Sequence, residues 1–397
     1  MCPELSKFAQ STGKSTIVGM RRQADELASK GMRIIDLGGG VPNFNAPEPV
    51  KEAAIKAIEE NKSRYLDPSG LSDLRSTISD YSQKFHGVKT EASQVVVTPG
   101  TFGALSIATR AILNPDDEVL VIEPFWGPYR DIIALTGAKP VGISMPSIEG
   151  KFVLDADLLA KAVNSNTKAI LINTPWNPTG RVLTNEELVD VSQLAVKHDL
   201  WIISDEVYSQ NVFDNAVHKS IAALGNEIAE RTIIVTSLSK SYAITGWRLG
   251  YAIAAPKVAE MLGRINQYSS RGAASMAQYA SITAINEGDL FIHETNEEYK
   301  SRRDEITKGL NDIEGVKCPL AEGGMFAFAE FPKSWGDSSD VADYLLNEKG
   351  VIVTPGSDFG LASRHHLRLS FVNSLEIVKE GIEILRQALF EKYHNRR

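Results

Sequence analysis

A strand–helix–strand unit occupies residues 167–208, which read TKAILINTPWNPTGRVLTNEELVDVSQLAVKHDLWIISDEVY. The runs at 169–172 and 201–203 are apolar and rich in isoleucine, as strands buried on both faces are. Between them, residues 186–197 follow helical spacing, and Thr184 and Glu187 form a capping box ahead of that helix. The unit predicts two parallel strands joined by a helix.

The same alternation continues on both sides of this unit. Apolar runs at 95–97, 119–122, 233–235 and 249–254 predict further strands, and residues 102–113 and 129–135 predict helices. Buried strands that alternate with helices are typical of a mostly parallel sheet covered on both faces. We therefore expect an α/β fold in which residues 46–289 form one large domain.

The pattern changes after residue 289. A long charged helix (291–310) precedes strands at 325–329 and 366–372 and helices at 341–348 and 375–393, which predicts a smaller α+β domain. Residues 1–45 carry one helix (16–29) and a short strand (33–37), too little for a domain of their own. We expect them to pack on residues 290–397 and to belong to the small domain.

Composition and charge exclude several classes of protein. The 397 residues include 42 Lys+Arg and 50 Asp+Glu, a net charge of −8, in an ordinary globular mixture that excludes disordered and fibrous chains. The acidic balance disfavours nucleic-acid binding. Neither Cys2 nor Cys318 lies in a CxxC pair, which disfavours zinc modules and disulfide frameworks and indicates a reducing compartment. No apolar stretch reaches membrane-spanning length and residues 1–7 lack a signal-peptide core, so we expect a cytoplasmic protein without a membrane partner.

Two local motifs do not fit the sites that they resemble. Gly13-Lys14-Ser15 looks like the end of a P-loop, but Phe8 replaces the first glycine of that motif and no strand precedes it. His365-His366 has no cysteine or carboxylate partner at metal-ligand spacing, so we expect no metal.

The predicted strands end in residues suited to one kind of ligand. In open α/β sheets, ligands bind beyond the carboxyl ends of the strands. There the chain supplies a small-residue turn at a helix start, an aromatic ring, an amide, a carboxylate with a phenol, and a lysine with hydroxyls. The residues are Gly100, Thr101, Trp126, Asn177, Asp205, Tyr208, Ser237, Ser239 and Lys240. A flat, phosphorylated, nitrogen-containing ring would use all five features, because backbone amides at a helix start favour a phosphate.

Three motifs in this order identify a family resemblance. They are Asn177-Pro178-Thr179-Gly180, Asp205-x-x-Tyr208, and Ser237-x-Ser239-Lys240 followed by Gly246-Trp247-Arg248-Leu249-Gly250. Together they resemble the class I/II aminotransferases, which are pyridoxal-phosphate enzymes of fold type I. The resemblance runs from about residue 34 to the final helix. It implies pyridoxal 5'-phosphate as cofactor and an amino acid and a 2-oxo acid as substrates.

The resemblance also implies roles for residues around the cofactor ring. Lys240 would hold the cofactor as a Schiff base, and its released amine would act as general base on the substrate Cα. Asp205 would pair with the ring nitrogen, Tyr208 and Asn177 would bond the phenolic oxygen, and Trp126 would stack on the ring. Considered alone, Asp205 could be a helix cap, Asn177 a turn residue and Trp126 a core residue. Nearby Arg248 and the cationic ring should lower the pKa of Lys240.

The remaining implied contacts concern the phosphate and the substrate. The phosphate would be held by Gly100, Thr101, Phe102, Ser237, Ser239 and Arg248, with Tyr65 reaching it from a neighbouring subunit. The substrate would be bound by Gly40, Trp126, Asn177 and Arg368, the last of these on its α-carboxylate. A shared site implies a homodimer.

Substrate choice depends on position 102. One aspartate-using branch of the family carries a lysine there, and this chain has Phe102, which favours neutral or aromatic donors with 2-oxoglutarate or another 2-oxo acid as acceptor. Phe102 could also simply pack at the helix start, and Arg271 could restore binding of an acidic side chain. β-Elimination or other carbanion chemistry on the same scaffold remains an alternative. A non-catalytic pyridoxal-phosphate-binding sensor is a remote one.

Overall fold

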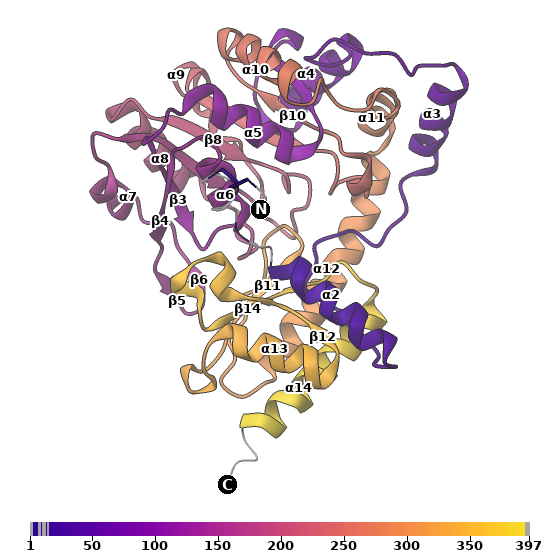
Figure 1. Cartoon of the computed structure of the whole chain (residues 1–397), viewed down its shortest axis with the longest axis vertical. Coiled ribbons are helices and arrows are strands. Elements are labelled where there is room, and N and C mark those ends of the chain that lie inside the picture. Colours follow the sequence, from indigo (N-terminus) through magenta and orange to yellow (C-terminus); the bar gives the residue numbers. More distant parts are fainter. Residues whose placement is uncertain (1–2, 7–8, 10–12, 14–15, 394–397) are drawn as a thin grey trace.

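The computed structural model describes residues 3–6, 9, 13 and 16–393 (Figure 1). Cys2, Phe8, Lys14 and Ser15, which entered the predictions above, lie outside the described residues. The larger part of the molecule surrounds a seven-stranded sheet, and the chain's C-terminal third forms a smaller part beside it.

The large sheet confirms the predicted mostly parallel arrangement. Its order is β2 (Val95–Thr98), β10 (Gly250–Ile253), β9 (Thr232–Ser237), β8 (Trp201–Asp205), β7 (Thr167–Asn173), β3 (Glu118–Glu123) and β4 (Lys139–Ser144). Only β10 runs antiparallel to its neighbours, β2 and β9. The register places Asn173 beside Asp205, and Asp205 beside Val235, so the carboxyl ends of β7, β8 and β9 share one edge.

Helices cover both faces of this sheet, which explains the continuous apolar runs. On β3, Val119 and Val121 pack with α5 (Gly100–Ile112), α6 (Pro128–Ala134) and α10 (Pro256–Ser269), whereas Leu120 and Ile122 pack with α7 (Ala156–Ala162) and α8 (Asn185–Lys197). Successive strand residues point to opposite faces, so a strand covered twice must be apolar at every position. Further helices are α3 (Glu48–Glu59), α4 (Ser72–His86), α9 (Asn226–Glu230) and α11 (Ser275–Glu287).

The predicted capping box begins α8. The Thr184 hydroxyl accepts from the Glu187 amide at 3.2 Å, and the Glu187 carboxylate accepts from the Thr184 amide at 2.8 Å. Edge strand β4 was missed because it contains Pro140 and Gly142 and is only half-buried. Only Val141 and Ile143 alternate in it, and two apolar positions are too few to indicate a strand by periodicity. A short hairpin, β5 (Ser147–Ile148) and β6 (Lys151–Phe152), follows it.

The smaller part contains an antiparallel sheet of β11 (Phe326–Glu330), β14 (His366–Ser370) and β13 (Thr354–Pro355), packed with α12 (Asp289–Asn311), α13 (Ser338–Lys349) and α14 (Leu375–Tyr393). Near the N-terminus, α2 (Thr16–Ser29) and β1 (Ile35–Asp36) lie against this part, and β1 pairs in parallel with β12 (Val351–Ile352). Their buried side chains join its core through Met20, Ala24, Ile35 and Leu37. The domain limits at residues 45 and 289 stay a prediction. No helix among the described residues is both long and apolar enough to cross a membrane.

Candidate functional site

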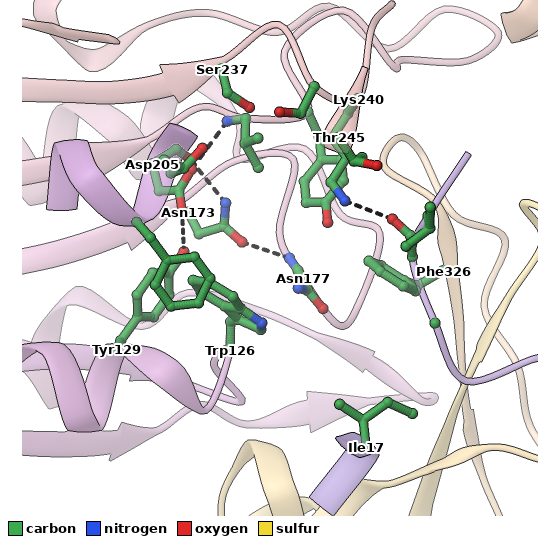
Figure 2. A pocket seen from close by; sticks show the side chains of 18 of the residues that line it. Ile17, Trp126, Tyr129, Asn173, Asn177, Asp205, Ser237, Lys240, Thr245 and Phe326 are labelled. Carbon is green, nitrogen blue, oxygen red and sulfur yellow. Dashed lines mark hydrogen bonds between the residues drawn. The ribbon is translucent and has the colours of Figure 1, made fainter. Parts of the chain in front are cut away.

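A pocket opens at the carboxyl edge of the large sheet, between that sheet and the smaller part of the molecule (Figure 2). It brings together most of the predicted site residues: Gly40, Thr101, Phe102, Trp126, Asn177, Asp205, Tyr208, Ser237, Ser239, Lys240, Arg248 and Arg368. Gly100 is not among the lining residues, but its Cα lies against the guanidinium of Arg248, which is. Residues from the two ends of the chain thus meet over strand ends from its middle.

Asp205 ends β8 as a deeply buried carboxylate, with 2% of its surface exposed. It accepts hydrogen bonds from the Tyr129 hydroxyl at 2.6 Å and from the Val207 amide at 3.1 Å. Burial raises the pKa of Asp205 to about 6, although both hydrogen bonds act in the opposite direction. A buried carboxylate without a cation bonded to it is well suited to a protonated ring nitrogen, which would favour its charged form.

A chain of hydrogen bonds links Asp205 to Arg368. The Asn173 side chain donates to the Asp205 carbonyl at 2.9 Å and accepts from the Asn177 amide at 2.7 Å. The side-chain oxygen Oδ1 of Asn177 then accepts from Arg368 Nη1 at 3.0 Å. These contacts orient Asn177 from both sides, which a simple turn residue would not require.

Arg368 is a buried cation aimed into the pocket. Its guanidinium donates to the Gly38 carbonyl at 2.7 Å and lies 4.0 Å from the centre of the Phe326 ring, while Nε is buried with no hydrogen-bond partner among the described residues. Burial lowers the pKa of Arg368 to about 10, so it stays charged at neutral pH. An unpaired buried charge is costly, and a bound carboxylate would offset that cost.

Lys240 also lines the pocket, and its amine donates to the Gly40 carbonyl at 2.6 Å. The pKa of Lys240 is lowered to about 8, chiefly by burial and then by the positive charges of Arg368 and Arg248, against the opposing effect of Asp205. The sequence predicted a lowered pKa of Lys240 from Arg248 and the cationic cofactor ring. Burial and Arg368 were missed because both depend on distant parts of the chain.

An anion cradle lies at the start of α5. Gly100 has φ +74°, and a Cβ there would lie 2.5 Å from Arg248 Nη2, so the guanidinium rests directly on the backbone. The first turn of α5 contains no acidic residue, and the buried hydroxyl side chains Ser237 and Ser239 face the same pocket. Amides at a helix start, two hydroxyls and an arginine fit a phosphate.

Aromatic side chains form another wall. Phe102 and Trp126 meet edge to face with ring centres 4.9 Å apart, and Trp126 meets Tyr129 in the same way at 5.3 Å. Phe102 is 47% exposed, so it faces the pocket rather than packing inside the helix start. Trp126 both lines the pocket and packs against the core beneath it, so its two interpretations are compatible.

Two residues do not join this pocket. Tyr65 is 82% exposed and stacks under the Arg271 guanidinium, 4.8 Å from the ring centre, in a separate surface hollow. The role of Tyr65 at a neighbouring subunit's phosphate and the role of Arg271 in binding an acidic side chain therefore stay predictions.

Sequence reasoning missed several lining residues. Asn173 ends β7 and could have been found by the strand-end rule, whereas Tyr129 lies inside a helix turn. Ile17 and Arg21 come from α2 and Phe326 from β11, with no local signal for a site.

A second polar cluster lies outside the pocket. Glu206 accepts from His218 at 3.1 Å and from the hydroxyls of Ser204 and Ser220, and His86 lies 4.0 Å away. Both oxygens of the Glu206 carboxylate thus accept hydrogen bonds, whereas Nδ1 of His86 and Nδ1 of His218 are buried without a hydrogen-bond partner among the described residues. His366 is buried and stacks on Phe328 with ring centres 4.8 Å apart, beside the apolar cluster that Phe328 shares with the large sheet.

Comparisons with known proteins point in one direction. Residues 32–385 match the model of a family described as "Aminotransferase class I and II". An aspartate aminotransferase of Bacillus subtilis is 33% identical over 97% of this chain and 98% of its own length, and aromatic-amino-acid aminotransferase 2 of Thermococcus litoralis is 33% identical over 94% and 95%. The structure of Thermus thermophilus aspartate aminotransferase with maleate has a TM-score of 0.92 at 32% identity, covering 98% of this chain and 100% of that one.

Proposed function

Because the chain belongs to the class I and II aminotransferases, which are pyridoxal-phosphate-dependent enzymes of amino-group transfer, we propose that its donors are neutral or aromatic L-amino acids. The acceptor would be a 2-oxo acid such as 2-oxoglutarate. The observation that carries this choice is the aromatic pair of Phe102 and Trp126, which lines the pocket where a lysine would favour an acidic side chain. An aromatic substrate gains edge-to-face contact as well as burial there.

The pocket's residues fit the cofactor at both ends. Arg248, Ser237, Ser239 and the first amides of α5 would hold its phosphate, and Asp205 its ring nitrogen. When bound, the ring withdraws electrons and so weakens the bond between the substrate Cα and its proton. The Tyr129 hydroxyl keeps Asp205 in place and favours its charged form.

Lys240 would carry the cofactor and move the proton. With a pKa near 8, a useful fraction of the amine is neutral near physiological pH, so Nζ can take the proton from the substrate Cα as a general base. Burial raises the pKa of Tyr208, so its phenol stays protonated and can donate a hydrogen bond. Arg368 would bind the substrate α-carboxylate through the guanidinium edge now facing Asn177 and Gly38.

We also propose a cytoplasmic homodimer, with residues 46–289 as its large domain and the two chain ends as its small one. Exposed Tyr65 and Arg271 form a surface hollow that could meet a second subunit's pocket. The scarcity of cysteine supports the location.

The donor class is tested with the holoenzyme and single amino acids in the absence of a 2-oxo acid. Phenylalanine and methionine should convert the visible absorption band, and aspartate should do so at least about tenfold more slowly, the discrimination expected from one missing charge pair. Added 2-oxoglutarate should then yield glutamate. In the control variant Lys240→Ala, we expect neither conversion of the absorption band nor formation of glutamate. Equal rates with aspartate would contradict the donor class, and release of ammonia with a 2-oxo acid in the absence of any acceptor would indicate elimination instead.

A further inference from the structure

The pocket holds one more cation than the proposed function uses. Its described lining residues include the cations Arg21, Lys240, Arg248 and Arg368 and the single carboxylate Asp205. Lys240, Arg248 and Arg368 are used by the cofactor, its phosphate and the substrate α-carboxylate. Arg21, which comes from α2, has no such task.

Arg21 is held at the pocket by Asp36. Its Nε and Nη2 donate to one oxygen of Asp36 at 3.0 and 2.9 Å, while the other oxygen accepts from the amides of Gly38 and Gly39 at 2.9 and 3.1 Å. Asp36 thereby fixes Arg21 to the glycine loop, residues 38–40, whose carbonyls accept from Arg368 and Lys240. The donors of Nη1 are not used by Asp36, and 45% of the Arg21 side chain is exposed.

Gly39 leaves the room that this arrangement requires. A Cβ at position 39 would lie 2.0 Å from Arg21 Nη2, so any other residue there would push the guanidinium away. The loop also brings the two arginines near each other, because Gly38 contacts Arg368 and Gly39 contacts Arg21. A ligand with two carboxylates could therefore be held by both.

The proposed amino-group acceptor, 2-oxoglutarate, is a ligand with two carboxylates. 2-Oxoglutarate carries a distal carboxylate that Phe102 and Trp126 cannot pair with, whereas an aromatic donor carries none. Asp36 neutralises Arg21 when the side chain in the pocket is uncharged, so the arginine does not penalise an aromatic ring there. The distal carboxylate of the substrate would accept from the Arg21 guanidinium as a second partner beside Asp36.

We propose that Arg21 binds the distal carboxylate of the 2-oxoglutarate acceptor, and so lets one pocket take both an aromatic donor and this longer dicarboxylic acceptor. This inference rests on the proposed function, since it assigns the recognition of its acceptor. It also differs from recognition by Arg271, which lies outside this pocket.

The test compares the holoenzyme's dissociation constants for two unreactive acids by calorimetry. Arg21→Gln should weaken glutarate binding about tenfold or more, the value of one charge-assisted hydrogen bond, and should leave 3-phenylpropionate binding within about twofold. Arg21→Lys should fall between wild type and Arg21→Gln, because it keeps the charge and loses the fork. Arg22→Gln, an exposed neighbour on the same helix, should change neither constant.

Kinetics give the second readout. In Arg21→Gln the KM for 2-oxoglutarate should rise with little change in kcat, and the KM for phenylpyruvate should stay constant. Equal weakening of both acids, or no weakening of glutarate, would overturn the proposal. Either result is separate from failure of the proposed function, which would show as no amino transfer from phenylalanine to any 2-oxo acid in the wild-type enzyme.

Discussion

To act as a general base, the Lys240 amine must have a pKa low enough to leave a substantial neutral fraction at neutral pH. It must do so in a pocket lined with arginines that bind anions. Anion-binding arginines help to meet this need, because Arg368 and Arg248 disfavour a third positive charge beside them. Asp205 opposes them, and burial adds the largest effect. The sequence alone indicated the arginine close to Lys240 along the chain, but not the more strongly acting Arg368 from β14.

Replacing Arg368 by Gln should raise the pKa of Lys240 from about 8 by roughly one unit, because a positive charge is removed. Since only the neutral amine reacts with the cofactor aldehyde, the rate at which apoenzyme captures pyridoxal phosphate should reach its midpoint at a higher pH. Arg364→Gln, on an exposed side chain of the preceding turn, is the control and should leave the midpoint unchanged. A midpoint that stays in place or falls in Arg368→Gln would show that Arg368 does not act on the amine.

At the scale of elements, the strand-end rule explains why much of the site could be predicted. Asp205 is the last residue of β8, and Asn177 and Lys240 follow β7 and β9 closely, so pattern alone places them at one edge. Their chemical roles came from the family resemblance and remain predictions. The start of α5 was predicted two residues late, because Gly100 takes a positive φ that helical periodicity does not reveal.

That glycine offers a test of the phosphate cradle. Gly100→Ala places a Cβ 2.5 Å from Arg248 Nη2 and demands a left-handed conformation of a residue with a side chain. The shifted guanidinium should raise the dissociation constant for pyridoxal phosphate about tenfold or more, while the backbone strain costs about 1–2 kcal/mol of stability. Gly246→Ala is the matched control, since a Cβ there meets nothing within 4 Å. If Gly100→Ala binds cofactor as tightly as Gly246→Ala, the cradle is assigned wrongly.

For the whole molecule, the open issue is where Tyr65 acts, because a single chain leaves it exposed and outside the pocket. In a hybrid dimer of one Lys240→Ala subunit and one Tyr65→Phe subunit, shared sites would give one intact site and one with both defects. We expect such hybrids to bind one equivalent of cofactor per dimer with wild-type affinity, as measured by visible titration. Two weakened sites and no intact one would show that Tyr65 serves its own subunit, and a monomer by sedimentation would refute the dimer.

The parts that the sequence could not predict are those that join distant segments. Arg21 lies near one end of the chain and Phe326 near the other, and only folding brings them to the same pocket. Gly40 and Arg368, which also come from the two ends, were assigned to the site by the family resemblance and not by a local pattern. No local pattern marks Arg21, whose pairing with Asp36 depends on how α2 packs beside β1. Sequence periodicity describes each element well, but it carries no information about which elements become neighbours across hundreds of residues.

The glycine loop after β1 has a consequence for the timing of biosynthesis. Gly38 accepts from Arg368, and β1 itself pairs with β12, so the loop reaches its final position only when the last strands exist. A nascent chain that has been synthesised as far as β10 already contains Asp205 and Lys240, but it does not yet contain β14. The pocket is therefore completed only once β14 has been synthesised, and a chain terminated before β14 would lack Arg368, which we expect to bind the substrate α-carboxylate.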